Sequence, residues 1–227
     1  MISKRLQAIV EWIDGTVMAD IGCDHGYVCI EAILQNKVKK AYACDIAQGP
    51  LQNAKETIKK YHLENQIECQ LMNGLSNLKE DVDLIVIAGM GAMTMIDILQ
   101  SYDMKKGMNL ICCPHKDVEL FRNYLSKSGY EIIKEKMIFE DHFYPILYIT
   151  YSGVSYSLSE HEQYYGYRMI QDEIFGSYIE SEIKKWTTIY QKCPDSKKIS
   201  LEKRLEALKK NTLEYIFYAY FFFYQLI

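Results

Sequence analysis

The chain has 227 residues, of which 49% are apolar and 25% are charged, and its formal net charge is −4. This length suits one domain of ordinary size with a small appendage, and the apolar content is enough for a sizeable core. The negative charge excludes a globally basic nucleic-acid binder, so any such binding must come from a local basic patch.

Cysteine and histidine usage narrows the class further. The seven cysteines include no C-x-x-C pair, and several fall in apparent core strands, so we expect reduced, buried thiols in a cytoplasmic protein. The five histidines lack metal-ligand spacing, and we expect no metal. The first five residues lack the long apolar region of a signal peptide.

The N-terminal segment, residues 3–13, places Leu6 and Ile9 on one helical face together with other apolar residues. Lys4 and Arg5 lie at the start of this predicted helix, away from the apolar face. They are candidates for phosphate contact, and a solvated helix end is the alternative interpretation.

The stretch around which the chain is organised follows at residues 16–36. An apolar run predicts a buried strand, the sequence Asp20-Ile21-Gly22-Cys23-Asp24-His25-Gly26 predicts a turn, and residues 27–36 predict a helix. Glycine there lets the backbone turn sharply and lets a ligand approach closely. Asp45 ends the next predicted strand, 41–44, where a carboxylate can bind ribose hydroxyls.

The acidic residues of this turn decide which nucleotide fits. A pyrophosphate needs a glycine-rich turn and a helix N-terminus free of negative charge, and Asp20 and Asp24 would repel it. S-adenosylmethionine fits instead, because it carries a sulfonium, an ammonium and one carboxylate but no phosphate. Asp24 could also cap the following helix, and both roles can coexist.

Strands and helices alternate along the rest of the first 153 residues, and then two strands pair without a helix between them. This pattern predicts a doubly wound α/β sheet of Rossmann type with an antiparallel strand near its edge. Ligands of such sheets bind at the carboxyl ends of the strands, where Asp24, Asp45, Asn73, Gly89 and Pro114 fall. The further strands are expected at 41–44, 67–71, 82–87, 108–112, 131–139 and 146–151, with a hairpin at 140–145, and the further helices at 51–62, 93–100 and 117–126.

After Gly153 the composition changes to long helical stretches, 158–192 and 197–213, which predict a helical hairpin of coiled-coil type. Residues 183–210 carry nine basic side chains against three acidic ones. This local excess suits phosphate contact, and a solvated helix face is the alternative. The last 13 residues, 215–227, are uncharged and rich in aromatic side chains, too short to span a bilayer, and expected to pack on the sheet or on another chain.

With these residues assembled, the chain resembles the bacterial tRNA adenine-22 N1-methyltransferase family over nearly its whole length. The motifs that carry the resemblance are Ser3-Lys4-Arg5-Leu6, residues 18–25, Gly49-Pro50 and Ile87-Ala88-Gly89-Met90-Gly91. The chain departs from the family pattern at Asn73, where aspartate is usual, at His115, where asparagine is usual, and at Ala92, where glycine is common.

The resemblance implies a class I methyltransferase domain at 1–153 and a helical coiled-coil domain at 154–227 that binds tRNA. It implies transfer of a methyl group from S-adenosylmethionine to N1 of an adenine, position 22. The positions of Asp24 and Met90 in the sequence, rather than the resemblance, make them the catalytic candidates. We assign the cofactor site to the glycine turn and the strand ends: Asp20, Gly22, Asp24, His25, Asp45, Ile46, Asn73, Gly74, Ala88 and Gly89. We assign tRNA contact to the basic residues Lys4, Arg5, Lys116, Lys184, Lys185, Lys197, Lys198, Lys203 and Arg204.

Other functions remain open at this point. A noncatalytic RNA-binding protein that keeps the cofactor fold, and a methyltransferase acting on another RNA or on a small molecule, both fit part of the pattern. A nicotinamide oxidoreductase is disfavoured by Asp24 at the phosphate position. No membrane span is expected, and a monomer is favoured.

Overall fold

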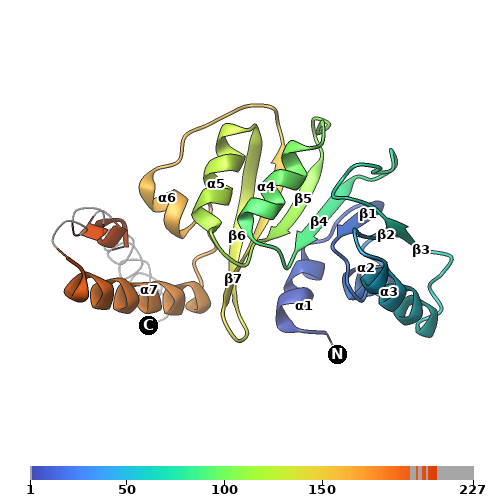
Figure 1. The fold of residues 1–227 in the computed structure, drawn as a ribbon, viewed down its shortest axis with the longest axis horizontal. Coiled ribbons are helices and arrows are strands. Elements are labelled where there is room, and N and C mark those ends of the chain that lie inside the picture. The colour runs from blue at the N-terminus through green and yellow to red at the C-terminus, as the bar shows by residue number, and fades with distance from the viewer. Residues whose placement is uncertain (1, 195–197, 199–200, 203, 209–227) are drawn as a thin grey trace, which may run out of the picture.

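The computed structural model describes residues 2–194, 198, 201–202 and 204–208, and a seven-stranded sheet with helices on both faces forms its centre (Figure 1). The predicted α/β fold is therefore confirmed. The strands are β1 (Val17–Ile21), β2 (Lys40–Asp45), β3 (Ile67–Leu71), β4 (Leu84–Ala88), β5 (Asn109–Cys113), β6 (Tyr130–Phe139) and β7 (Phe143–Tyr151). The helices are α1 (Lys4–Glu11), α2 (Tyr27–Leu34), α3 (Gln48–Lys60), α4 (Ala92–Gln100), α5 (Val118–Lys127), α6 (Glu160–Tyr165) and α7 (Glu173–Lys192).

The sheet order is β3-β2-β1-β4-β5-β7-β6, and the first five strands in the chain run parallel. β7 is antiparallel to both of its neighbours, which confirms the predicted antiparallel strand near the edge. β4 consists of five consecutive apolar residues and lies between β1 and β5, as expected of a central parallel strand. The carboxyl ends of β1, β2, β4 and β5 therefore meet at one edge of the sheet.

Helices bury apolar stripes on each face of the sheet. α1, α2 and α3 contribute Ile9, Ile30 and Leu51 to the core of one face. α4 and α5 contribute Met95 and Phe121 to the core of the other. Both sets follow the 3.6-residue periodicity that the sequence shows. This two-layer core fixes the strand ends and the loops that follow them.

Two predictions at the end of the sheet domain are wrong in their boundaries. β7 begins at Phe143, so the hairpin joining it to β6 is three residues shorter than expected. The single helix expected at 158–192 is divided into α6 and α7 at Gly166, whose φ of 129° a side chain would strain. α7 starts anew at Asp172, which accepts a hydrogen bond from the backbone N–H of Phe175 at 2.9 Å.

Beyond α6 the chain turns away from the sheet, and α7 lies at the opposite end of the molecule from α3 (Figure 1). Residues 201–202 and 204–208 are helical, and Leu208 packs with Phe175 and Ile179 of α7. The predicted second helix of the hairpin is described only at these residues, so a coiled coil stays a prediction. Lys197, Lys203 and the aromatic segment 215–227 lie outside the described residues.

Three further observations concern the chemistry of the whole chain. All seven cysteines are free thiols, and Cys112 and Cys113 are fully buried in β5. In the part of the chain that the structure describes, no three His, Cys, Asp or Glu side chains lie close enough to hold a metal ion. Among the same residues, no helix combines the length and apolarity needed to cross a membrane.

Candidate active site

A cavity of about 380 Å³ opens at the carboxyl ends of β1, β4 and β5. Cavities of a few hundred Å³ are typical of small-molecule sites in open α/β sheets. The structure brings many of the sequence-predicted residues into its wall: Asp20, Gly22, Asp24, His25, Ala88, Gly89, Met90 and Arg5. The loops after β1 and β4 therefore meet at one cavity, and ligand binding there stays a prediction.

The glycine turn after β1 has the backbone geometry that the sequence requires. Gly22 has φ +80° and donates from its N–H to the carbonyl of Cys44 at 2.8 Å. A Cβ atom on Gly22 would come within 2.3 Å of the Met90 terminal methyl. Met90 therefore lies directly over the turn, and a side chain at position 22 would have to displace its terminal methyl. Gly89, with φ +81°, has open space where its Cβ would be.

Gly22→Ala tests this close approach. We expect the substitution to lower the free energy of unfolding by about 1–2 kcal/mol, because alanine is strained at this φ. We also expect weaker binding of the predicted cofactor, since the new methyl displaces Met90 into the cavity. Calorimetric titration measures the second effect. The matched control is Gly49→Ala, whose Cβ meets nothing within 4 Å, and an equal loss in both variants would contradict the assignment.

Asp20 is the carboxyl group of the cavity whose pKa is shifted most from its ordinary value. Its side chain is buried on the central strand β1, with 3% of the residue exposed. Burial, together with the charge of Asp45 on the neighbouring strand, raises the pKa of Asp20 to about 7. Carboxyl groups with raised pKa values in a cleft are typical of functional sites. A buried carboxyl group without a partner destabilises the fold, so its presence here favours a functional role.

Asp24 lies at the opening of the same cavity, with 68% of its side chain exposed and its carboxylate 3.7 Å from His25 Nε2. The helix-cap interpretation of Asp24 is wrong. α2 begins after Gly26, and no side chain caps its N-terminus. Asp24 instead has a left-handed backbone, with φ 47°.

The predicted cofactor residues after β2 and β3 lie outside the described cavity wall. Asp45 ends β2, and its Oδ1 accepts a hydrogen bond from the Ala47 N–H at 2.9 Å. Ile46 beside it is two-thirds exposed. Asn73 and Gly74 follow β3, where Gly74 has φ +56° and approaches Ile98. These residues share the carboxyl edge with the cavity, and their cofactor contacts stay a prediction.

One residue that the sequence did not assign to the cofactor or to catalysis lines the cavity, and a second supports it from behind. His115 follows β5 and lines the wall, and its Nε2 is hydrogen-bonded to the Arg5 guanidinium. Tyr144 in β7 lies under that guanidinium, 4.9 Å from its ring centroid. The sequence pattern predicts Tyr144 in a hairpin. Nothing in that pattern predicts that the hairpin packs against α1.

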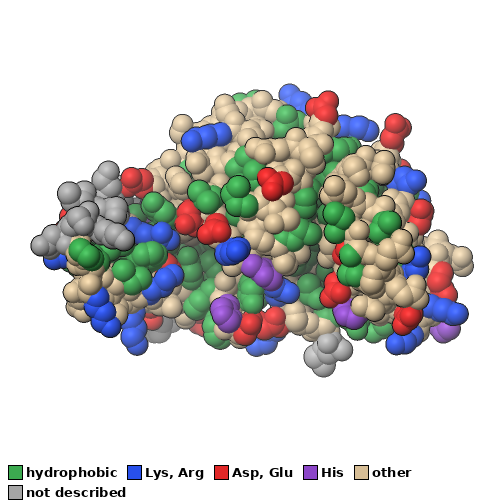
Figure 2. Space-filling model, viewed as in Figure 1, with side chains coloured by type: hydrophobic (Ala, Val, Ile, Leu, Met, Phe, Trp, Pro, Cys, Tyr) green, Lys and Arg blue, Asp and Glu red, His purple; other side chains and the backbone are tan. Residues whose placement is uncertain are grey.

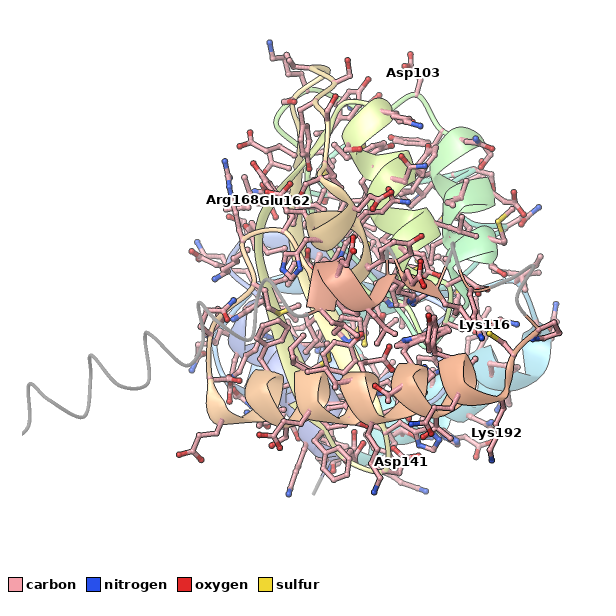
Figure 3. The ribbon with its side chains drawn as sticks, turned by 90° about the vertical axis from the view of Figure 1, so that its left-hand side faces the viewer. Asp103, Lys116, Asp141, Glu162, Arg168 and Lys192 are labelled. Atoms are coloured by element: carbon pink, nitrogen blue, oxygen red, sulfur yellow. The ribbon has the colours of Figure 1, made fainter. Side chains whose placement is uncertain are left out.

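The predicted tRNA-binding residues fall into two groups. Lys4 and Arg5 lie at the start of α1, and Lys116 packs over Gly91, all near the cavity. The others belong to the segment after the sheet domain, residues 154–227, here called the arm, where Lys184 and Lys185 lie on α7. A few histidine, lysine and arginine side chains lie near the centre of the face in Figure 2, with acidic side chains beside them. Seen from the side, Lys116 and Lys192 lie toward the same side of the molecule (Figure 3).

Several of the arm residues have partners within the chain. Lys185 forms an ion pair with Glu182 at 2.8 Å, and Lys198 lies 5.8 Å from the Tyr190 ring centroid. The Arg204 guanidinium stacks on Trp186, 4.0 Å from the ring centroid. Arg204 therefore has a structural role in the arm, and contact of these side chains with tRNA stays a prediction.

Comparison with known proteins agrees with this arrangement. Residues 2–147 match a family model described as a methyltransferase domain. The tRNA (adenine(22)-N(1))-methyltransferase of Bacillus subtilis is 38% identical over 144 residues, which are 62% of this chain and 60% of that relative's length.

Solved structures extend the likeness through the arm. TrmK of M. capricolum, in complex with S-adenosylhomocysteine, is 32% identical with a TM-score of 0.82, and the match covers 93% of this chain and 97% of that one. Streptococcus pneumoniae Sp1610, in complex with S-adenosylmethionine, is 26% identical with a TM-score of 0.80 over 92% and 99% of the two chains. The chain belongs to the tRNA (adenine-22 N1)-methyltransferase family.

Proposed function

We propose that this protein transfers a methyl group from S-adenosylmethionine to N1 of an adenine, position 22, in tRNA. The observation that carries the proposal is the cavity at the end of β1, with buried Asp20 in its wall and Asp24 at its opening. Two carboxyl groups suit the ammonium and sulfonium of this cofactor and repel a pyrophosphate. Relatives of this family were solved with S-adenosylmethionine and with its product.

The chemistry asks little of the protein beyond alignment. N1 of neutral adenine has a free lone pair, so no base has to activate it before it attacks the methyl carbon. The carbon–sulfur bond breaks as the nitrogen–carbon bond forms, which requires the three atoms in line and water excluded. In a duplex N1 is paired, so the base has to leave its stack. The open space at Gly89 leaves room for it, with Met90 available for stacking.

The positive charge formed on the base also needs compensation. Asp24 is the candidate for this compensation, because its exposed carboxylate lies at the cavity opening, where the target base would enter. In this proposal Asp20 faces the cofactor cation and Asp45 accepts hydrogen bonds from the ribose. A noncatalytic RNA-binding protein would have no use for a buried Asp20, whose burial is costly.

The test is methylation of unmodified total tRNA with labelled S-adenosylmethionine, followed by mapping of the modified nucleoside. We expect 1-methyladenosine at one position, and a substrate with guanosine there should accept no label. Labelling of small molecules but not of tRNA would favour a small-molecule enzyme. Cofactor binding without any transfer would favour the noncatalytic alternative.

We further propose that residues 154–227 form an arm that grips the tRNA backbone while residues 1–153 perform the chemistry. The basic excess at 183–210 supports this, and lysine contacts provide affinity rather than base selection. We also propose that the arm is a coiled-coil hairpin with a second helix after α7, and that the protein is a monomer. A cytoplasmic location is proposed as well, and the free thiols support it.

Charge reversal in the arm tests this grip. For the triple variant Lys197→Glu, Lys198→Glu and Lys203→Glu, we expect unchanged S-adenosylmethionine binding and weaker tRNA binding. The slope of log affinity against log salt should fall by about 0.7–0.9 for each phosphate that the arm no longer neutralises. Filter-binding titrations at several salt concentrations measure both quantities.

The control carries the same charge change elsewhere. Lys55, Lys59 and Lys60 are exposed on α3, at the other end of the molecule, and their reversal should leave the salt slope as in the unaltered chain. If the arm variant keeps both affinity and slope, Lys4, Arg5 and Lys116 near the cavity become the preferred tRNA contacts.

A further inference from the structure

The cavity has a second wall that the cofactor assignment does not use. His115 and Arg5 line it from the loop after β5 and from α1. The backbone N–H of His115 donates to the Met90 carbonyl at 2.9 Å. This bond holds His115 beside the Met90 turn, on the side where the target base would enter.

The protonation state of His115 follows from its partner. An arginine guanidinium has only donors, so in its hydrogen bond with Arg5 the Nε2 of His115 is the acceptor. The ring proton is then on Nδ1. Partial burial and the Arg5 charge lower the pKa of His115, against the opposing charge of Asp141, so the imidazole is neutral near pH 7. The Nε2 of His115 is thus an acceptor, and in this structure its lone pair is occupied by Arg5.

Arg5 is held by other interactions that do not depend on that bond. Its guanidinium lies over the Tyr144 ring at 4.9 Å, and the Tyr144 hydroxyl donates to Asp141 at 2.9 Å. The Lys4 N–H donates to Glu140 at 2.9 Å and fixes the start of α1. The Arg5 Nε is buried and has no hydrogen-bond partner among the described residues. Arg5 therefore has unused donor capacity for a phosphate.

We propose that His115 determines the choice of base: its Nε2 exchanges the Arg5 donor for the 6-amino group of the target adenine. This inference rests on the proposed methyl transfer to N1. Adenine has a donor at position 6, whereas guanine has an acceptor there, which a neutral imidazole acceptor repels. Released from His115, Arg5 binds the phosphate of the extruded nucleotide.

The same contact also favours the transition state. As N1 bonds to the methyl carbon, positive charge spreads to the 6-amino group, and its N–H becomes a stronger donor. A hydrogen bond that strengthens during the reaction raises the rate rather than only the affinity. The imidazole gains no proton, so no second cation forms beside the charged product base.

The test removes the hydrogen bond between His115 and the 6-amino group in two ways, by changing the substrate base and by changing the protein. Transfer is measured to a tRNA transcript carrying adenine and to one carrying purine, which lacks the 6-amino group, at the same position. With the unaltered chain we expect kcat/KM for purine to fall roughly tenfold to a hundredfold relative to adenine. With His115→Ala we expect adenine transfer to fall similarly and the adenine-to-purine ratio to drop to the smaller value set by the lower nucleophilicity of purine N1, since neither substrate then has the His115 partner.

Two further variants separate recognition from structure. His115→Asn keeps an acceptor in its amide oxygen and should restore a preference for adenine. His142→Ala changes a histidine on the neighbouring hairpin that does not line the cavity and is 78% exposed, and it should leave the ratio unchanged. S-adenosylmethionine affinity should be the same in all variants.

An unchanged adenine-to-purine ratio in His115→Ala would overturn the assignment while methyl transfer to tRNA stands. Absence of any transfer to the adenine transcript by the unaltered chain would instead overturn the proposed function itself. The two failures are therefore distinguishable in one set of measurements.

Discussion

Replacing Arg122 with methionine is expected to lower the free energy of unfolding by about 3–5 kcal/mol. Arg122 and Glu135 are an almost completely buried ion pair, with side chains 1% and 0% exposed. Two guanidinium nitrogens donate to the carboxylate at 2.8–3.1 Å. Without Arg122, Glu135 would keep one donor, the Tyr167 N–H at 2.8 Å, and would be left as an uncompensated buried charge.

The effect should extend to the start of the arm. Arg122 Nη1 also donates to the carbonyls of Gln163 and Tyr164, both at 3.1 Å, so one side chain joins α5 of the sheet domain to the end of α6. Removing it leaves both carbonyls without that donor. We therefore expect the segment around residues 163–167 to exchange its amide hydrogens faster than the sheet does.

Denaturant unfolding of three variants checks this. Arg122→Met should be strongly destabilised, and adding Glu135→Leu should recover part of the stability, because the isolated charge disappears with its partner. Arg168→Met is the matched control: its ion pair with Glu131 at 3.0 Å is about half exposed, so removing it should cost less than about 1 kcal/mol. Equal destabilisation of the Arg122 and Arg168 variants would contradict this prediction, because the buried ion pair would then contribute no more to the free energy of unfolding than the exposed one.

The sheet could be predicted from the sequence because its signals are local. Each parallel strand is a short apolar run, and each following helix has one apolar face, so strand order and crossover direction follow from general rules. The division of the arm at Gly166 could not be predicted in this way. It depends on the contact of Met169 with β6 and on the hydrogen bonds that Arg122 and Glu135 make with residues 163–167, which join residues far apart in the chain.

The part of the cavity wall that follows β1 could likewise be predicted from the sequence, since Asp20, Gly22 and Asp24 lie within five residues and have a recognisable spacing. The wall formed by Arg5 and His115 could not be predicted in this way. Arg5, His115 and Tyr144 come from three distant elements, and their association depends on how α1 crosses the end of the sheet. The burial of Asp20 could be expected of a strand residue, whereas its raised pKa depends on the strand pairing that brings Asp45 near.

Asp20 is also expected to make the cofactor-free protein less stable as the pH rises from about 4 to 7. Its folded-state pKa of about 7 lies above its ordinary value of 3.8, so in this window the folded chain binds a proton that the unfolded chain has released. Stability from this group is fully present below the unfolded-state pKa and is lost as the pH approaches 7. With about 1.4 kcal/mol per pH unit, the decrease reaches about 4 kcal/mol.

Asp20→Asn should abolish this slope, because the amide keeps the shape of the carboxyl group but has no charge to bury. The measurement is denaturant unfolding of cofactor-free protein between pH 4 and pH 8, read as the difference between the variant and the unaltered chain. We expect that difference to favour the variant increasingly up to pH 7 and to level off above it. Asp97→Asn, at an exposed position on α4, is the control and should leave the pH dependence unchanged.

Adding S-adenosylmethionine should stabilise the unaltered chain more at pH 8 than at pH 6. Its positive charge compensates the negative charge of ionised Asp20, whereas a protonated Asp20 has no charge to compensate. A constant difference between Asp20→Asn and the unaltered chain at every pH would mean that Asp20 is ionised throughout this range and that its carboxylate is solvated through the cavity.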